Sequence, residues 1–236
     1  MQSLKEHVAK AYYKFRRWKR QFDLVGQDRL EIFTSYYEKN QWKDAESKSG
    51  TGSNLIETQA VRQILPKIFS QLDVKTLLDV PCGDFNWMQH VDLTGIDYTG
   101  GDIVEALIDE NRKTYGKSGR VFRQLDICKE VPSNHDLILC RDALVHLSNK
   151  DIWSAISNFK ASGSDYILTT TFPNVEKNAS IPTGMWRPLN LQRQPFNFPP
   201  PMKIYSEKNE NLDFRYGEKC LGLWRLENLP TATCHD

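Results

Sequence analysis

Apolar residues change their spacing near residue 76, and this change divides the chain into two parts. Before it, apolar residues recur every three or four positions, which predicts helices over residues 3–22, 28–42 and 53–69, the last with Ser53 as its N-cap. After it, short apolar runs such as TLLDV, DLILC and DYILTTTF alternate with amphipathic stretches such as VEALIDENRKTYG and NKDIWSAISNFK. This alternation is typical of a parallel sheet with crossover helices.

Two later apolar runs, MKIYSE and CLGLWRLENL, have no helical stretch between them. We expect them to form an antiparallel pair at the edge of the sheet. The predicted fold class is therefore α/β, with a doubly wound, mostly parallel seven-stranded sheet, an antiparallel edge pair and preceding N-terminal helices. Residues 1–72 are interpreted as a helical extension, and residues 73–236 as the α/β domain.

The segment of residues 174–201 has no periodicity and holds six of the eleven prolines of the chain. A long irregular segment within a compact domain is usually functional or disordered, and the aromatic residues of this one argue against disorder. We expect a proline-rich lid over a ligand crevice. The alternative is a proline-stiffened plug over the edge of the sheet.

Charge is unevenly spread over the 236 residues, whose net charge is +1. Residues 1–22 carry a net +6, and the remaining chain carries a net −5, which argues against a nucleic-acid partner. The basic amphipathic helix of residues 1–22 has two interpretations: peripheral contact with an anionic membrane, or packing on the domain or on a second subunit. The second interpretation is favoured.

The five cysteines are dispersed and form no C-x-x-C pair. They predict reduced thiols, a cytoplasmic location and no metal site. No apolar run approaches the length of a membrane span, and the first residues lack the apolar core of a signal peptide.

Acidic residues stand at the ends of four successive predicted strands, at Asp79, Asp102, Asp126 and Asp142. Ligands of an open parallel sheet bind beyond the carboxyl ends of its strands, so these residues face one crevice. A dinucleotide is disfavoured, because the turn PCGDFN keeps one glycine of G-x-G-x-x-G and adds an acid where phosphates would lie.

The motifs LLDVPCGDFNW, YTGGDI, QLDI and LILCRDALVHLS occur in this order. They resemble those of class I S-adenosylmethionine (SAM)-dependent methyltransferases over residues 76–172, and more weakly toward the C-terminus. The chain departs from the common D-x-G-x-G-x-G pattern at Pro81 and Phe85 and keeps only the middle glycine. The resemblance implies a Rossmann-like domain and SAM as the cofactor.

The resemblance also implies roles for residues at the strand ends. Gly83 would let the backbone approach the cofactor, and Asp79 would face its ammonium group, directly or through water. Asp102 would accept hydrogen bonds from the ribose hydroxyls, Asp126 would accept one from the adenine amine, and the amide of Ile127 would donate to a ring nitrogen. The remaining expected cofactor contacts are Cys82, Ile103 and Arg141.

On the acceptor side, Asp142 and His146 are the candidates for a general base, which a hydroxyl acceptor usually needs. Within residues 174–201, Trp186 and Phe198 are expected to stack on a ring, and Arg187, with Arg193, to recognise an anion. The polar loop ESKSGTGS, with Trp42 and residues 49–53, is expected to close over the cofactor from the N-terminal side.

The sequence thus predicts a SAM-dependent methyltransferase that acts on a small molecule or glycan, with O-methylation favoured. No N-P-P-Y-like motif supports methylation of bases or glutamine. Two alternatives remain: a protein or RNA methyltransferase, which would need a substrate groove or basic face, and a non-catalytic cofactor-binding or scaffold protein.

Overall fold

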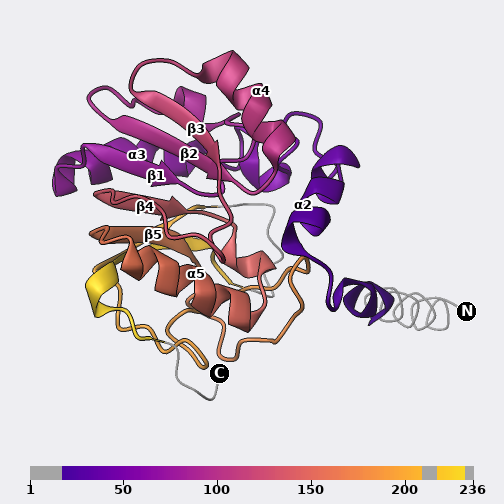
Figure 1. Ribbon diagram of the computed structural model, residues 1–236. Helices are drawn as coiled ribbons and strands as arrows, with labels where there is room; N and C mark the ends of the chain where they lie inside the picture. The colour runs from indigo at the N-terminus through magenta and orange to yellow at the C-terminus, as the bar shows by residue number, and fades with distance from the viewer. Residues whose placement is uncertain (1–17, 209–216, 232–236) are drawn as a thin grey trace, which may run out of the picture.

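The computed structural model describes residues 18–208 and 217–231 of the chain. At its centre is a seven-stranded sheet with the strand order β3-β2-β1-β4-β5-β7-β6 (Figure 1). The sheet is mostly parallel, has an antiparallel pair at one edge and carries helices on both faces. The fold class predicted from the sequence is confirmed.

Five strands are parallel and end at the same edge of the sheet. They are β1 (Thr76–Asp79), β2 (Asp97–Asp102), β3 (Arg120–Gln124), β4 (Leu137–Cys140) and β5 (Tyr166–Thr171). Strand β7 (Cys220–Arg225) pairs antiparallel with β5, and β6 (Lys203–Ser206) pairs antiparallel with β7. The polar ends of the parallel strands therefore meet at one crevice, as expected.

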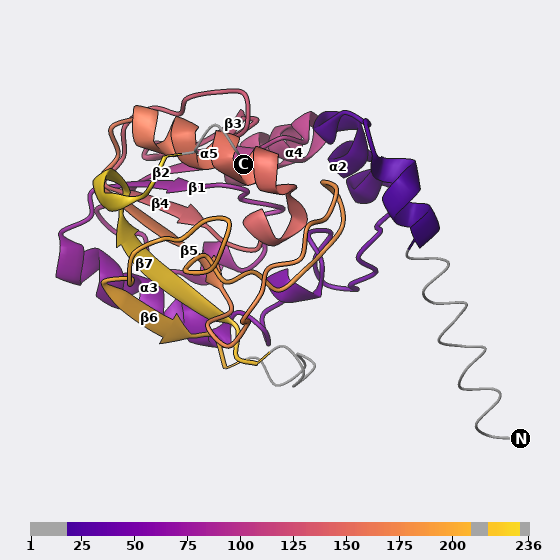
Figure 2. The same cartoon turned by 90° about the horizontal axis from the view of Figure 1, so that it is seen from below.

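Helices bury both faces of the sheet. Helix α3 (Gln59–Leu72) and helix α5 (Asn149–Ala161) lie on opposite faces (Figure 2), and the buried side chains of α4 (Glu105–Tyr115) join the same apolar cluster as those of α3. In β1, Leu77 belongs to the α3 cluster and Leu78 to the α5 cluster. This is why the strand is apolar at successive positions instead of alternating.

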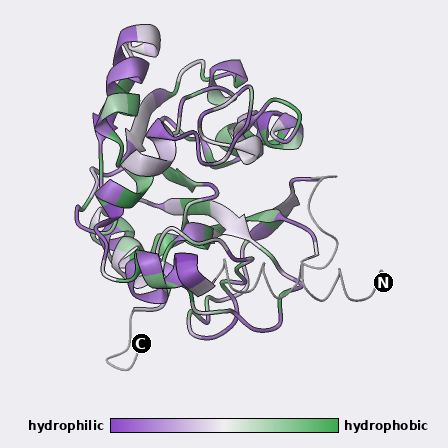
Figure 3. Ribbon diagram, turned by 90° about the vertical axis from the view of Figure 1, so that its right-hand side faces the viewer, coloured by the Kyte–Doolittle hydropathy of each residue, from purple (hydrophilic) through white to green (hydrophobic). Residues whose placement is uncertain are grey.

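The helices are amphipathic, and their ribbons alternate between hydrophilic and hydrophobic colours in Figure 3. Helix α5 begins where the sequence predicts, because the Ser148 hydroxyl accepts a hydrogen bond from the amide of Asp151 at 3.1 Å. Helix α2 (Arg29–Glu38) lies beyond the carboxyl ends of the parallel strands (Figure 1).

The expected N-cap at Ser53 was wrong. Helix α3 begins at Gln59, and Thr51–Ser53 instead forms a short 3₁₀ turn. The amide of Leu55 donates to the side chain of Glu46, and the amide of Glu57 donates to the side chain of Asn54. These side chains hold the segment before the helix in a loop. The buried residues of α3 pack in the same core as the sheet.

The expectation that residues 174–201 form a lid is corrected, because most of this segment is a plug. Leu189, Leu191, Phe196 and Phe198 are buried in the α5 cluster, and none of them lines the pocket described below. Within the segment, residues 184–186 reach that pocket. The apolar side chains of this segment cover the sheet face next to α5, so its prolines stiffen a packed layer.

The predicted basic helix of residues 1–22 lies mostly outside the described residues. Residues 18–24 are helical, and the exposed rings of Trp18 and Phe22 stack with centroids 6.1 Å apart. Whether the basic helix contacts lipid or protein stays a prediction. In the described part of the chain, no helix has the length and apolar character needed to cross a membrane.

The plug predicts that Phe196→Ala destabilises the protein. Phe196 is fully buried and packs 5.5 Å from the ring of Trp153. We expect the free energy of unfolding to fall by about 3–5 kcal/mol, measured by urea denaturation. The exposed Glu176 of the same segment supplies the control, and Glu176→Ala should leave the unfolding curve unchanged. Similar curves for wild type and Phe196→Ala would mean that the segment is not part of the core.

Candidate functional site

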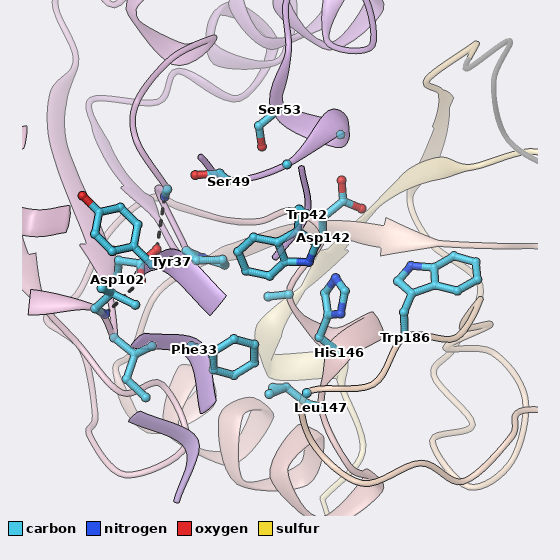
Figure 4. Close-up of a pocket in the computed structure, with 18 of the residues that line it drawn as sticks. Phe33, Tyr37, Trp42, Ser49, Ser53, Asp102, Asp142, His146, Leu147 and Trp186 are labelled. Atoms are coloured by element: carbon cyan, nitrogen blue, oxygen red, sulfur yellow. Dashed lines mark hydrogen bonds between the residues drawn. The ribbon is translucent and has the colours of Figure 1, made fainter. Parts of the chain in front are cut away.

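A pocket of about 1130 Å³ lies at the carboxyl ends of the parallel strands. In Figure 4, Asp102 and Tyr37 lie at one end, His146 and Trp186 at the other, and Trp42 between them. Of the predicted cofactor residues, Cys82, Gly83, Asp102, Ile103, Asp126, Ile127 and Arg141 line this pocket. The predicted acceptor residues Asp142, His146 and Trp186 line it as well.

The turn after β1 and the end of β2 are tied together at the Asp102 end of the pocket. The amide of Gly83 donates to Asp102 Oδ2 at 3.2 Å, and the amide of Val104 donates to Oδ1 at 3.0 Å. Each carboxylate oxygen keeps a second lone pair for a ligand hydroxyl. Burial raises the pKa of Asp102 to about 6, so the group is largely ionised at neutral pH.

Gly83 adopts a left-handed conformation with φ 55°. A side chain there would place its Cβ 2.3 Å from the hydroxyl oxygen of Ser49, which belongs to the polar loop before α3. The glycine is therefore required both by the backbone conformation and by the close approach of this loop.

Asp84 explains why an acid follows this glycine. Its carboxylate accepts hydrogen bonds from the Ser47 hydroxyl at 2.9 Å and from the Lys48 amide at 2.8 Å. In return, the amide of Asp84 donates to the Ser49 hydroxyl at 2.9 Å. Asp84 thus fastens the N-terminal loop over the β1 turn. The sequence predicted that this loop closes over the pocket, but it did not reveal Asp84 as the residue that holds it.

Helix α2 forms a wall of the pocket that the sequence analysis missed. Arg29, Phe33 and Tyr37 are spaced by four residues, lie on one face of the helix and all line the pocket. Arg29 donates to Asp126 Oδ2 at 3.1 Å and to Asp151 Oδ1 at 2.7 Å, which fixes the helix over the crevice. The i, i+4 spacing of these three residues was visible in the sequence, but it did not predict that they line a pocket.

The placement of Asp126 changes its expected role. Its Oδ2 accepts from Arg29, and its Oδ1 accepts from the amide of Cys128 at 2.9 Å. Part of the hydrogen-bonding capacity of the carboxylate is therefore used within the protein. The neighbouring Ile127 lines the pocket.

Asp79 is the one predicted cofactor residue that does not line the pocket. It is buried, with an exposed fraction of 2%, and its Oδ2 accepts a hydrogen bond from the Tyr98 hydroxyl at 2.7 Å. Burial raises the pKa of Asp79 to about 7. A direct contact with a ligand ammonium does not fit this position, and the predicted interaction through water remains.

Four charged side chains, three of them buried and the half-buried Asp142, form a cluster at the His146 end of the pocket. Arg141 Nη2 lies 2.6 Å from Glu207 Oε2, and Lys219 Nζ lies between Glu207 Oε2, at 3.2 Å, and Asp142 Oδ2. Arg141 Nη1 also donates to the carbonyl of Gly52 at 2.7 Å. Lys219 and Glu207 were missed from the sequence, because they follow β6 and precede β7, far from any motif.

Asp142 is held as an ionised group. Burial would raise its pKa, but the adjacent Lys219 and Arg141 cations outweigh burial and lower the pKa of Asp142 to about 2. Its residue conformation is left-handed, with φ 56°, and its amide donates to the Thr170 hydroxyl at 2.8 Å. A carboxylate with so low a pKa is a poor proton acceptor near neutral pH, but it remains a hydrogen-bond acceptor.

His146 has the properties of a base. Its Nδ1 lies 3.1 Å from the carbonyl oxygen of Met185, which can only accept, so Nδ1 carries the proton and Nε2 of the neutral ring does not. Burial lowers the pKa of His146, although the Asp142 carboxylate acts in the opposite direction. The neutral form therefore dominates at neutral pH. The ring meets Trp42 edge-on at 6.3 Å.

Two of the predicted substrate residues are corrected. Arg187 has an exposed fraction of 1% and donates to the carbonyl of Leu147 at 2.6 Å, so its charge points into the core. Phe198 is buried and packs edge-on against Trp224 at 5.6 Å. Neither lines the pocket, because apolar packing fixes the segment that carries them. Trp186 does line it, 6.1 Å from the ring of Phe172.

No group of three or more His, Cys, Asp or Glu side chains suited to a metal ion occurs among residues 18–208 and 217–231. The four cysteines within these ranges are unpaired thiols. Burial raises the pKa of Cys128, which lines the pocket, to about 12, so the thiol is neutral.

Solved structures share this fold. A 1,6-didemethyltoxoflavin-N1-methyltransferase from Burkholderia thailandensis, with bound 1,6-didemethyltoxoflavin and S-adenosylhomocysteine, has a TM-score of 0.58 at 14% identity, over 83% of this chain and 86% of that chain. Magnesium protoporphyrin IX methyltransferase (ChlM) from Synechocystis PCC 6803, with bound SAM, has 0.54 at 14% identity, over 85% and 98%. The N-methyltransferase NodS from Bradyrhizobium japonicum WM9 has 0.51 at 13% identity, over 74% and 98%.

The chain therefore has the fold of class I SAM-dependent methyltransferases. The compounds named for the first two structures, 1,6-didemethyltoxoflavin and magnesium protoporphyrin IX, differ chemically, so the fold does not define an acceptor. No protein-family model matches the sequence, and no curated protein is significantly similar to it.

The burial of Asp79 predicts a pH dependence of stability. With a folded-state pKa of about 7, Asp79 keeps its proton between pH 4 and 7 while the unfolded chain releases it. The contribution of Asp79 to the free energy of unfolding therefore falls as pH rises through this range, by on the order of 4 kcal/mol. Asp79→Asn still accepts from Tyr98 but does not titrate, so it should lack this fall.

The measurement is urea denaturation of wild type and Asp79→Asn at pH 4.5 and pH 8. The difference in unfolding free energy between the two proteins should shift in favour of the variant as pH rises. A difference that is the same at both pH values would contradict the assignment of Asp79 as a buried, protonatable acid.

Proposed function

We propose that the protein is a SAM-dependent methyltransferase that transfers a methyl group to a hydroxyl of a small molecule or glycan. The observation that carries the proposal is one pocket that joins the Gly83–Asp102 end to the Asp142–His146 end. A donor at the first end and an acceptor at the second would share one continuous space. Alignment of the two in such a space is a large part of the catalysis of a displacement reaction.

The residues at the first end fit the cofactor. Asp102 offers an ionised carboxylate with lone pairs for two hydroxyls, as a ribose requires. Ile103 and Ile127 provide apolar contacts for an adenine ring, and the turn at Gly83 brings the backbone close. Asp84 places a carboxylate beside this turn, which suits a ligand without phosphate groups. When bound, SAM supplies a methyl group on a sulfonium centre.

At the second end, His146 is the proposed base and Asp142 the proposed positioning group. Nε2 of His146 would take the proton of the acceptor hydroxyl as the oxygen forms its bond to the methyl carbon. Asp142, which stays ionised because Lys219 and Arg141 surround it, would accept a hydrogen bond from a neighbouring hydroxyl. The acidic body of the chain and the enclosing α2 wall favour a small acceptor over a nucleic acid.

The first test is cofactor binding. Asp102→Ala should weaken SAM binding by about 1.5–3 kcal/mol, roughly 10- to 150-fold, because a charged hydrogen-bond acceptor is lost. Calorimetry with SAM and with S-adenosylhomocysteine measures this. Asp97→Ala is the matched control, since Asp97 lies exposed at the opposite end of the same strand. Equal SAM affinity of wild type and Asp102→Ala would remove the ribose assignment.

The pKa of Asp102 adds a pH signature to the same experiment. A protonated carboxyl accepts hydrogen bonds poorly, and the pKa of Asp102 is raised to about 6 by burial. SAM affinity should therefore be constant above pH 7 and fall as pH drops through about 6. Asp102→Ala should lack this fall.

The second test is methyl transfer from labelled SAM to a pool of small hydroxylated molecules and glycans. His146→Gln should lower kcat by about 10²- to 10⁴-fold, because the base is lost, while the SAM dissociation constant stays the same. Because burial lowers the pKa of His146, the wild-type rate should rise with pH along a limb below pH 6.5. A His146→Gln variant with wild-type kcat would show that the reaction needs no base at this position.

A further inference from the structure

Two of the cations that line the pocket, Lys19 and Arg20, differ from the others. Four pocket cations are each paired with a carboxylate: Arg29 with Asp126 and Asp151, Lys48 with Glu110, Arg141 with Glu207, and Lys219 with Asp142. Lys19 and Arg20 also line the pocket, and within the described ranges neither forms an ion pair with a carboxylate.

Arg20 is held in place although it is exposed. Its Nη2 donates to the hydroxyl of Tyr36 at 3.0 Å, and its guanidinium lies 5.3 Å from the centre of the Tyr36 ring. Tyr36 is buried and donates its own hydroxyl hydrogen to the carbonyl of Gly184 at 2.9 Å. One nitrogen of Arg20 is therefore anchored, and the rest of its planar fork of donors remains for a ligand.

Aromatic contacts connect this cation to the proposed base. The Tyr36 ring meets Trp42 edge-on at 5.6 Å, and Trp42 meets the His146 ring at 6.3 Å. Arg20 is close enough to contribute to the lowered pKa of His146. Trp42, between the two ends of the pocket, and Trp186, at the His146 end, are half-buried and offer flat indole faces to a ring (Figure 4).

We propose that Arg20 binds an anionic group of the acceptor, so that the substrate is a ring compound carrying a carboxylate or a phosphate in addition to its hydroxyl. This proposal rests on the proposed methyl transfer, because it assigns the anion to the methyl acceptor. The anion subsite itself can be tested by binding alone. A guanidinium fork matches the two oxygens of a carboxylate or phosphate, and Trp42 would carry the ring between the anion and His146.

The probes are two matched glycosides and one phosphate ester. 4-Nitrophenyl glucuronide carries a carboxylate where 4-nitrophenyl glucoside carries a hydroxymethyl group, and 4-nitrophenyl phosphate presents the other anion. Equilibrium dialysis in the presence of S-adenosylhomocysteine measures their binding. Wild type should bind at least one anionic probe about tenfold or more tightly than the glucoside, and this preference should weaken with added salt, because Arg20 is exposed.

Variants identify the residue responsible. Arg20→Gln should abolish the preference, and Arg20→Lys, which keeps the charge but loses the fork, should retain part of it. Arg225→Gln is the control, because Arg225 is an exposed cation outside the pocket, and it should bind the probes as wild type does. If wild type binds neither anionic probe more tightly than the glucoside, or if Arg20→Gln keeps the preference, the proposal is wrong.

A separate readout distinguishes this proposal from the cofactor assignment. Arg20→Gln should leave the dissociation constant of SAM unchanged, whereas Asp102→Ala should raise it. If Arg20→Gln weakens SAM and leaves the anionic probes unaffected, Arg20 recognises the carboxylate of the cofactor and the acceptor proposal is overturned. If neither wild type nor any variant binds SAM while wild type still prefers the anionic probes, the anion subsite stands and the proposed methyl transfer fails.

Discussion

Burial of both faces of the parallel sheet is the constraint on which the rest of this structure depends. Strands β1 and β4 place apolar side chains against α3 on one face and α5 on the other, so they have no room for a charge along their length. The acid of β1, Asp79, therefore stands at the last position of its strand, and Arg141 and Asp142 follow β4. The carboxyl ends of five parallel strands meet at one edge, and this is where the pocket forms.

A crevice that gathers this many acids must neutralise them to remain stable, because buried like charges repel. In this structure, cations from segments far apart in the sequence form ion pairs with these acids. Arg29 of α2 pairs with Asp126, and Lys219, just before β7, pairs with Asp142. These pairs also fix the walls of the pocket: the first holds α2 over the crevice, and the second makes Asp142 an ionised acceptor instead of a base. Arg20, in contrast, is anchored on Tyr36 and forms no ion pair with a carboxylate among the described residues.

How much could be predicted from the sequence depended on how local the determining interaction was. The strands, α4 and α5 follow from apolar spacing, and the acids at the strand ends follow from the parallel arrangement. The segment of residues 174–201 was misjudged because its composition fits both a lid and a plug. Which of the two forms depends on whether its apolar side chains find a face of the sheet to cover, and that face is built from distant strands.

The sequence by itself determined the order of strands and helices, the edge at which the strand ends gather, and the turn at Gly83 that lies there. These are consequences of backbone periodicity, connection handedness and the conformational freedom of glycine, all of which act over short stretches of chain. Only the tertiary structure decided which groups at that edge are available to a ligand. Asp79 is buried and accepts a hydrogen bond from Tyr98. Asp84 accepts hydrogen bonds from the N-terminal loop, and the guanidinium of Arg187 lies in the core. The physical reason is that the charge, burial and free lone pairs of a side chain are set by its neighbours in space, and those neighbours come from all parts of the chain.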